Sequence, residues 1–263
     1  MTDSYKDVFW NEVYKNTSFS NWDFKKGPLM LEDDEIKNAV SNLSKEEIPT
    51  DSKQIRIQCY MTNREQRPEI FVKKDLFLLP YTNRSRLIFK GEGYFDIPKL
   101  DKSSIVDFEI KPEFKLESSS VGESEMQHLD YAFAVGIVQD FVGNQNLKLT
   151  IRGHKRGTFD YKVSGIDMKA TSVQTEVDAG YEGEEEILLF EAKNDIKITN
   201  EIIRQLFFPK RKWEEDTTKK IRNFFSQYNK KEKSLSLYEY GFKEKLEYTS
   251  LELIKTAKYI LDN

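Results

Sequence analysis

Cysteine and histidine are nearly absent from this sequence, which has one cysteine, Cys59, and two histidines, His128 and His154. A lone cysteine excludes a disulfide framework and a cysteine zinc site, and two histidines are too few for a histidine-rich metal centre. No apolar run approaches the ~20 residues that span a bilayer. The polar N-terminus, MTDSYKDVFW, lacks the pattern of a signal peptide. We therefore expect a soluble, cytoplasmic protein with no membrane partner.

An excess of positive charge is also missing, since 41 lysines and arginines face 45 aspartates and glutamates. The charges are nevertheless segregated. Basic residues cluster at 84–90, 152–156 and 210–220, and acids at 32–35 and 182–186. Salt screening confines each field to ~8–10 Å, so a basic cleft in an acidic protein can still bind phosphates. The clusters are equally consistent with solvated faces, and net charge does not exclude nucleic acid.

Composition and length predict a folded protein, because 38% of 263 residues are hydrophobic, enough for one large domain or two modest ones. In residues 1–117 a helix is expected over 31–43, followed by short β-like runs. These runs are QIRIQCY, EIFV, DLFLLP and RLIFKGEGYF. Residues 111–122, with proline, serines and glycine, are typical of a linker. The pattern predicts a smaller, mostly β N-terminal module over 1–117.

Residues 118–263 alternate between helical and strand patterns. Ser124 and Gln127 have the spacing of a capping box, which predicts a helix through Val142. Thr199 is a candidate N-cap for a second helix that Pro209 interrupts or ends. Strands are expected at 147–152, 158–163, 172–178 and 187–193, with mixed β and helical patterning in the tail. The fold class expected is α/β, an α+β mixed sheet with flanking helices.

The most informative constellation is Asp178, followed by Glu191-Ala192-Lys193. Strand side chains alternate, so Glu191 and Lys193 share a face where an apolar strand ends. Two carboxylates can hold Mg²⁺, which lowers the pKa of a bound water and offsets charge on a phosphate. A lysine can orient or help deprotonate that water and stabilise the transition state. A strand-end ion pair between Glu191 and Lys193 remains the alternative.

The pairing of Asp178 with Glu191 depends on the turn between their strands. A turn centred near Glu182 would place Asp178 opposite Glu186, several residues from Glu191. Glu176 lies on the same face as Asp178 and nearer to Glu191 in that register. Glu176 is therefore kept as the alternative metal ligand.

Several segments together resemble the PD-(D/E)XK nucleases, and among them a branch of the type II restriction endonucleases. The resemblance is carried by Asp178 in VQTEVDAGYEG, by Glu191 and Lys193 in ILLFEAKND, and by the helix IIRQLFFPKRKW. Further similar segments are SEMQHLDYAF at 124–133, LTIRG at 149–153, LYEYGF at 237–242 and, more faintly, NREQRPEIF at 63–71 and LLP at 78–80.

The resemblance implies a restriction-endonuclease-like core and Mg²⁺-dependent, sequence-specific cleavage of double-stranded DNA that leaves 5′-phosphate ends. Asp178 and Glu191 would be the metal ligands and Lys193 the catalytic lysine. Glu125 would supply a third carboxylate, as in some relatives, although an acid in a first helical turn also interacts favourably with the helix dipole. A homodimer is implied as well, with residues 118–263 as the nuclease core and 1–117 for recognition, clamping or dimerisation.

Candidate DNA contacts come from three places. Arg204 and Gln205 follow the lysine strand and could position the scissile phosphate. The basic run of His154, Lys155 and Arg156 could contact phosphates. In the N-terminal module Arg64 and Arg67 are candidates, because arginine reads guanine edges and also binds phosphates. All of these residues fit ordinary surface positions too.

Other functions remain open. One alternative is a PD-(D/E)XK nuclease of repair or of modified-DNA cleavage. A second is a catalytically silent DNA-binding module on the same fold, against which the intact acid–acid–lysine set argues. A third is a structural role, in which the charged tail pairs with a protein partner.

Overall fold

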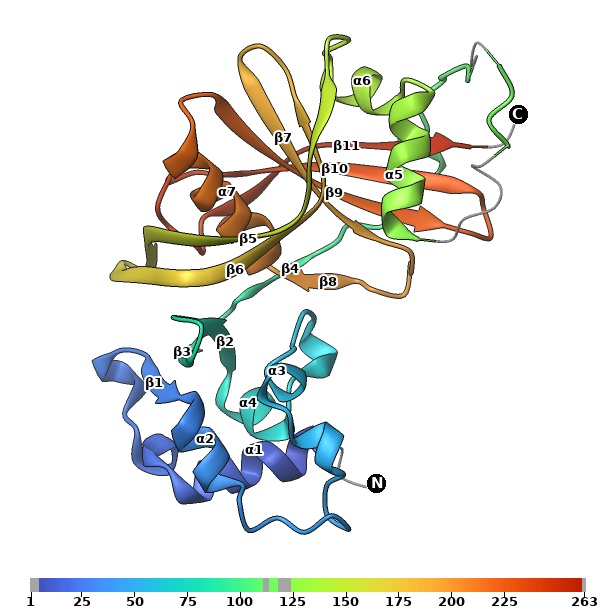
Figure 1. The fold of residues 1–263 in the computed structure, drawn as a ribbon. Helices are drawn as coiled ribbons and strands as arrows, with labels where there is room; N and C mark the ends of the chain where they lie inside the picture. Colours follow the sequence, from blue (N-terminus) through green and yellow to red (C-terminus); the bar gives the residue numbers. More distant parts are fainter. Residues whose placement is uncertain (1–4, 111–113, 118–123, 262–263) are drawn as a thin grey trace.

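The computed structural model describes residues 5–110, 114–117 and 124–261, and its main feature is a six-stranded mixed sheet (Figure 1). The strand order is β11-β10-β9-β7-β6-β5. The strands are β5 (Lys148–Val163), β6 (Ile166–Glu182), β7 (Glu186–Lys193), β9 (Lys220–Asn229), β10 (Ser234–Phe242) and β11 (Leu251–Ile260). Neighbouring strands pair antiparallel except β7 and β9, which are parallel. The parallel pair requires a crossover connection, which α7 (Arg204–Asp216) provides.

Helices cover both faces of this sheet (Figure 1). Helices α5 (Glu125–Ala134) and α6 (Ile137–Val142) pack on one face, where Leu129 and Phe141 join a core with Phe190 and Phe224. On the other face Trp213 of α7 packs against a small apolar cluster that includes Ile187 and Leu189 of β7. The expected α+β class, a mixed sheet with flanking helices, is thereby confirmed at this level of detail.

The two predicted helices of residues 118–263 differ from the expectation in their bounds. Ser124 does cap α5 by accepting a hydrogen bond from the Gln127 amide, but the helix divides at Gly136. With φ at +88°, Gly136 adopts a conformation that side chains disfavour. Thr199 is not an N-cap, because residues 200–202 form a strand; α7 begins at Arg204. The helix also continues through Pro209, which removes one backbone hydrogen bond but is itself buried.

That strand is β8 (Asn200–Ile202), which pairs antiparallel with β4 (Tyr94–Asp96) far back in the sequence. A three-residue strand leaves almost no local pattern, so its partner decides its structure. Two other differences concern strand length. The runs at 147–152 and 158–163 belong to one strand, β5, and residues 251–260 form the edge strand β11.

The N-terminal module was expected to be mostly β, but it contains both helices and strands. Its sheet has the order β1-β3-β2, formed by β1 (Leu29–Glu32), β2 (Leu76–Pro80) and β3 (Ser85–Lys90). Its helices are α1 (Tyr5–Asn16), α2 (Asp33–Ala39), α3 (Ile55–Gln58) and α4 (Glu69–Lys74). Short 3₁₀ helices cover Ser18–Asn21, Phe24–Lys26, Thr50–Lys53, Arg64–Gln66 and Lys102–Ser104. The runs QIRIQCY and EIFV contribute α3 and α4, because a short apolar run fits a buried helical turn as well as a strand.

The N-terminal module has its own core, yet its last part packs on the large sheet. Trp10 and Phe71 lie in the separate core, whereas Phe95 packs edge-on against Phe225 of β9. Ile105 forms an isolated bridge with Lys258 of β11. The predicted linker, 111–122, and the predicted boundary after residue 117 fall largely on residues outside the described part of the chain.

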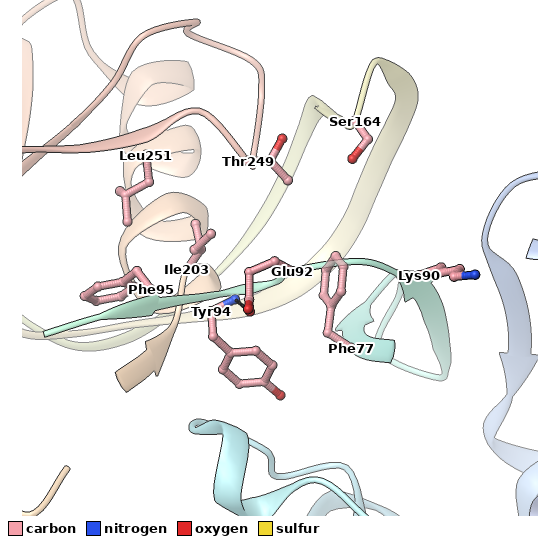
Figure 2. A pocket seen from close by; sticks show the side chains of 9 residues that line it. All are labelled: Phe77, Lys90, Glu92, Tyr94, Phe95, Ser164, Ile203, Thr249 and Leu251. Atoms are coloured by element: carbon pink, nitrogen blue, oxygen red, sulfur yellow. Dashed lines mark hydrogen bonds between the residues drawn. The ribbon is translucent and has the colours of Figure 1, made fainter. Parts of the chain in front are cut away.

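A cavity of about 280 Å³ marks the place where the small sheet meets β4 and the start of α7 (Figure 2). Its floor is buried and apolar, and its rim is exposed and polar. The floor is formed by Phe77, Tyr94, Phe95 and Ile203, and the rim by Lys90, Glu92, Ser164 and Thr249, with Leu251 half-buried beside them. Glu92 accepts a hydrogen bond from the Tyr94 amide at 2.9 Å, so this rim carboxylate is tied to β4.

Candidate active site

The hairpin of β6 and β7 brings Asp178 level with Glu191. Ala179 pairs with Phe190 and Glu182 with Ile187, so residues 183–185 form the turn. Gly183 closes it by donating its amide to the Glu186 carbonyl at 2.9 Å. The expectation of a turn centred near Glu182, with Asp178 opposite Glu186, is therefore wrong. The turn is centred between residues 184 and 185, later in the chain than expected, and this register favours Asp178.

A β-bulge sets the direction of the Asp178 side chain. Val177 pairs with Gly153 and Gly180 with Ile151, so two residues of β6, Asp178 and Ala179, oppose the single residue Arg152. Val177 consequently packs on the α7 side of the sheet, while Ala179 packs on the α5 side. Bulges of this kind re-aim side chains beside functional sites. At this bulge the Asp178 carboxylate turns toward β7.

Glu191 lies at the centre of the cluster and is only 4% exposed. Its Oε1 accepts a hydrogen bond from Nε2 of Gln205 at 3.0 Å and also contacts the ammonium of Lys193. Gln205 comes from the first turn of α7, so the helix after the lysine strand contributes directly to the cluster. The structure therefore brings together Asp178, Glu191, Lys193 and Gln205.

The protonation of these groups departs from that of exposed side chains. Burial, followed by the charge of Glu191, raises the pKa of Asp178 to about 7. Burial alone would lower the pKa of Lys193, but the charges of Glu191, Glu201 and Glu125 outweigh it and hold the pKa above its usual value. Lys193 is accordingly an ammonium ion at neutral pH, suited to stabilising negative charge.

Glu125 and Glu176 lie at the margin of the cluster. Glu125 is half-buried in the first turn of α5, and burial, reinforced by the charge of Glu191, raises its pKa. Glu176 is exposed, pairs across the strands with His154, and borders a shallow depression shared with Glu191 and Gln205. Both predicted additional acids are thus near Glu191, with Glu125 the more buried.

Glu201 is a residue of this cluster that the sequence analysis missed. It lies in β8, is fully buried, and neither of its carboxylate oxygens has a hydrogen-bond partner in the part of the chain that the structure describes. Burial raises its pKa to about 8, against the opposing charge of Lys193. An acid in ITNEII, a segment with isoleucines on both sides of it, was a weak signal, because buried acids are rare without a function or a partner.

The donor atoms available to a metal are carboxylate oxygens. Among the described residues, no group of three or more histidine, cysteine, aspartate or glutamate side chains is placed to hold a metal ion. Mg²⁺ nevertheless is usually held through one or two carboxylates, with water and phosphate oxygens completing its shell. The pair Asp178 and Glu191 therefore fits a hard cation such as Mg²⁺ and does not fit a closed zinc site.

The other predicted DNA contacts of the core lie beside this cluster. The positive charge of Arg204 acts on Glu201, and its backbone amide donates to the Tyr248 hydroxyl at 3.0 Å. His154, Lys155 and Arg156 are exposed on the edge strand β5.

A depression of about 230 Å³ opens on this edge strand. It is lined by Thr150, Ile151, Arg152, Gly153, His154, Lys155, Thr175, Val177 and Trp213. Lys155 lies over the Trp213 ring at 5.0 Å and pairs with Asp216 at 2.8 Å, and Arg156 donates to the Ser172 carbonyl at 3.0 Å. The depression is basic and aromatic, as a surface for phosphates and bases would be.

Arg64 and Arg67 of the N-terminal module are engaged within the chain. Arg64 pairs with Glu92 at 3.2 Å and with Asp96 at 2.5 Å. Arg67 lies over the Tyr94 ring at 5.3 Å and donates to the Leu76 carbonyl at 3.3 Å. Any DNA contact of Arg64 would have to compete with its two ion pairs.

The fold and the site define an α+β protein in which an acidic, lysine-bearing cluster lies at the C-terminal end of a central strand. The family model called "Domain of unknown function (DUF6997)" matches residues 89–260, so the chain belongs to that family. No curated protein and no solved structure matches it. The match begins at Phe89, near the end of β3, and so includes residues 94–110, which pack on the large sheet. Within the described residues no helix is long and apolar enough to cross a membrane.

Proposed function

We propose that the protein is a Mg²⁺-dependent endonuclease of the type II restriction class, which cleaves double-stranded DNA at specific sequences and leaves 5′-phosphate ends. The observation that carries the proposal is the approach of Asp178 to Glu191 on neighbouring strands, with Lys193 and Gln205 in contact with Glu191. The order of elements also supports a restriction-endonuclease-like core. A helix precedes the β6–β7 hairpin, and α7 crosses over to the parallel strand β9.

In this proposal Asp178 and Glu191 hold Mg²⁺ through carboxylate oxygens. When bound, the metal lowers the pKa of a coordinated water and offsets charge on the phosphate. With the metal bound, the oxygen of a water would attack phosphorus in line and the water would release a proton to solvent. The bond from phosphorus to the 3′ oxygen would break, and that oxygen would take up a proton from solvent. The products are a 5′-phosphate and a 3′-hydroxyl.

The remaining side chains have separate roles. Lys193, held as an ammonium ion by its acidic neighbours, stabilises the extra negative charge of the transition state and does not act as the base. Gln205 fixes the direction of the Glu191 carboxylate through the 3.0 Å hydrogen bond. Glu125 is a candidate for a further acid, and Arg204 for a contact with the scissile phosphate.

DNA binding is assigned to the exposed basic strand β5, with His154, Lys155 and Arg156 on phosphates. The N-terminal module serves recognition, clamping or dimerisation, with Arg64 and Arg67 as its candidate contacts. A homodimer would place two equal active sites on the two strands of a symmetric target. Sedimentation of the protein with and without DNA measures this assembly directly.

Cleavage of unmodified phage and plasmid DNA tests the proposal. The reaction is run with Mg²⁺, with EDTA in place of Mg²⁺, and with the variant Lys193→Ala. Lys231→Ala, in the exposed turn after β9, is the matched control for loss of a lysine. We expect discrete fragments with the wild type and with Lys231→Ala. We expect none with EDTA, and a rate lower by about 100-fold or more with Lys193→Ala.

Two other outcomes would change the proposal. A Mg²⁺-dependent smear, or cleavage confined to damaged or modified DNA, would keep the nuclease and replace the restriction class with repair or modified-DNA cleavage. Tight, salt-sensitive DNA binding without cleavage under any divalent metal would indicate a catalytically silent binder. Absence of both binding and cleavage would contradict a role on DNA.

A further inference from the structure

Glu201 has no role in the reaction proposed above. It is the middle residue of β8, opposite Phe95 of β4, and is 0% exposed. Both of its carboxylate oxygens lack a hydrogen-bond partner among the described residues. A buried acid without partners is costly, so native proteins rarely keep one unless it is used in another state.

Two positive charges act on Glu201, and the effect of Lys193 is larger than that of Arg204. The pKa of Lys193 is raised first by the charge of Glu191 and next by that of Glu201, against the effect of burial. The side chain of Lys193 is 12% exposed and its ammonium is hydrogen-bonded to Glu191 Oε1. Lys193 therefore interacts with the charges of two acids and bonds one of them, while both oxygens of the other lack a hydrogen-bond partner among the described residues.

Binding of a divalent cation at Glu191 would disturb this arrangement. The same oxygen, Oε1, already accepts from the Lys193 ammonium and from Gln205. A dication on this carboxylate repels a neighbouring ammonium, so Lys193 needs a second acceptor close by. Glu201 is that acceptor, because its two oxygens can take the ammonium without exposing it to solvent.

We infer that Glu201 is a positioning residue that accepts the ammonium of Lys193 when Glu191 binds the divalent cation. The inference rests on the proposed metal site and adds a second, defined position for the lysine. In one position Lys193 pairs with Glu191 and competes with the cation. In the other Lys193 pairs with Glu201, which leaves Glu191 free for the cation and keeps the ammonium within the site.

A double-mutant cycle on Mn²⁺ affinity, measured by calorimetry at pH 8.5 without DNA, tests this inference. The proteins are the wild type, Glu201→Gln, Lys193→Ala and the variant with both changes. Glu201→Gln keeps the shape of the side chain and is expected to fold; the melting temperature checks this. We expect it to weaken Mn²⁺ binding about 10-fold or more, because the ammonium then stays on Glu191. With alanine at 193 no ammonium competes, so Glu201→Gln should have almost no effect there.

The buried acid Glu247, which accepts hydrogen bonds from the amides of Ser164 and Gly165, supplies a control. Glu247→Gln should leave Mn²⁺ affinity unchanged. Equal weakening by Glu201→Gln with lysine or alanine at 193 would overturn the inference, since Glu201 would then act only through its charge or its packing. No weakening with Lys193 present would overturn it too.

The same experiment separates this inference from the proposed function. If the wild type binds Mn²⁺ and Asp178→Asn abolishes binding, the metal site stands whatever the cycle gives for Glu201. If the wild type does not bind Mn²⁺, or if Asp178→Asn leaves the affinity unchanged, the metal site itself is wrong. The role of Glu201 is then wrong with it.

Discussion

The backbone amide of Ala192 donates a hydrogen bond to Oδ2 of Asp178 at 2.8 Å. This bond joins the bulge of β6 to the backbone of β7 at Ala192, the residue between Glu191 and Lys193. It fixes Oδ2 of Asp178 against the backbone of β7, and a carboxylate has a second oxygen that can bind another ligand. The position of Asp178 is thus fixed before any substrate binds, which is the pre-organisation that electrostatic catalysis requires.

Asp178→Asn should remove cleavage and at the same time stabilise the protein at alkaline pH. Ionised Asp178 is half-buried beside Glu191, and its raised pKa reports the cost of that charge. The amide of asparagine carries no charge, and its oxygen can still accept from Ala192. Thermal unfolding at pH 8.5 should give a melting temperature higher by about 3–8 °C, since 1 kcal/mol corresponds to about 2–4 °C in a protein of this size. A lower melting temperature would contradict this account of the site.

The metal-free protein should lose stability between pH 5 and pH 8.5. The pKa of Asp178 is raised to about 7 and that of Glu201 to about 8, whereas unfolded carboxyls titrate near 4. The folded state therefore binds more protons in this range. The stabilisation is fully present below about pH 4 and is lost as the pH rises through about 7 and 8. Denaturant titrations at several pH values measure it.

Cation binding adds a control to the same prediction. At pH 6.5 a cation that binds ionised Asp178 must displace a proton, so calorimetry in buffers of different ionisation enthalpy should detect proton release. Asp178→Asn, which should abolish binding, should show no such release. If stability instead rises steadily from pH 5 to pH 8.5, the raised pKa values are wrong.

Gln205→Ala should lower the cleavage rate while the protein stays folded. The change removes the 3.0 Å hydrogen bond to Glu191 and leaves Lys193 as its remaining side-chain partner in the described site. Loss of a group that orients a metal ligand typically costs about 10–100-fold in metal affinity or activity. Steady-state cleavage at rising Mg²⁺ separates the two effects. Exposed Gln174→Ala, on β6 away from Glu191, is the matched control and should cleave normally.

Arg156→Ala should weaken DNA binding about equally for all sequences. Arg156 is exposed on β5 and its partner is a backbone carbonyl, so its charge is available to a phosphate. Loss of one phosphate contact should reduce the slope of log binding constant against log salt by about 0.9. Filter binding or anisotropy at several salt concentrations measures the slope. Lys231→Ala again serves as the control, and an unchanged slope for Arg156→Ala would remove β5 from the DNA surface.

The sequence indicated which residues could form a cluster, but not how they are arranged. The Glu-Ala-Lys triplet at the end of an apolar strand was visible, because alternation along one strand is a local property. The pairing of Asp178 with Glu191 was not, since it depends on the turn at 183–185 and on the bulge opposite Arg152. The turn moves the partner of Asp178 from the expected Glu186 to Glu191, and the bulge adds one residue to β6; no residue pattern specifies either change.

Elements whose structure depends on distant partners were missed for a related reason. β8 is a strand because β4 lies beside it, about a hundred residues earlier in the chain. The burial of Glu201 follows from that pairing, so the acid between isoleucines at 198 and 202 was only a weak signal for it. Conversely, the cap of α5 at Ser124 was predicted correctly, because capping involves neighbours along the chain.

The exposed edge strand β5 has a consequence for solubility. An unpaired strand edge can add strands from other molecules, and proteins often discourage this with bulges and positive charges. β5 has register shifts near residues 151 and 157, and carries Arg152, Lys155 and Arg156. The charges that would attract a polyanion therefore also keep this edge from joining a second sheet. Neutralising them all would promote aggregation, so each basic residue on β5 is better tested singly.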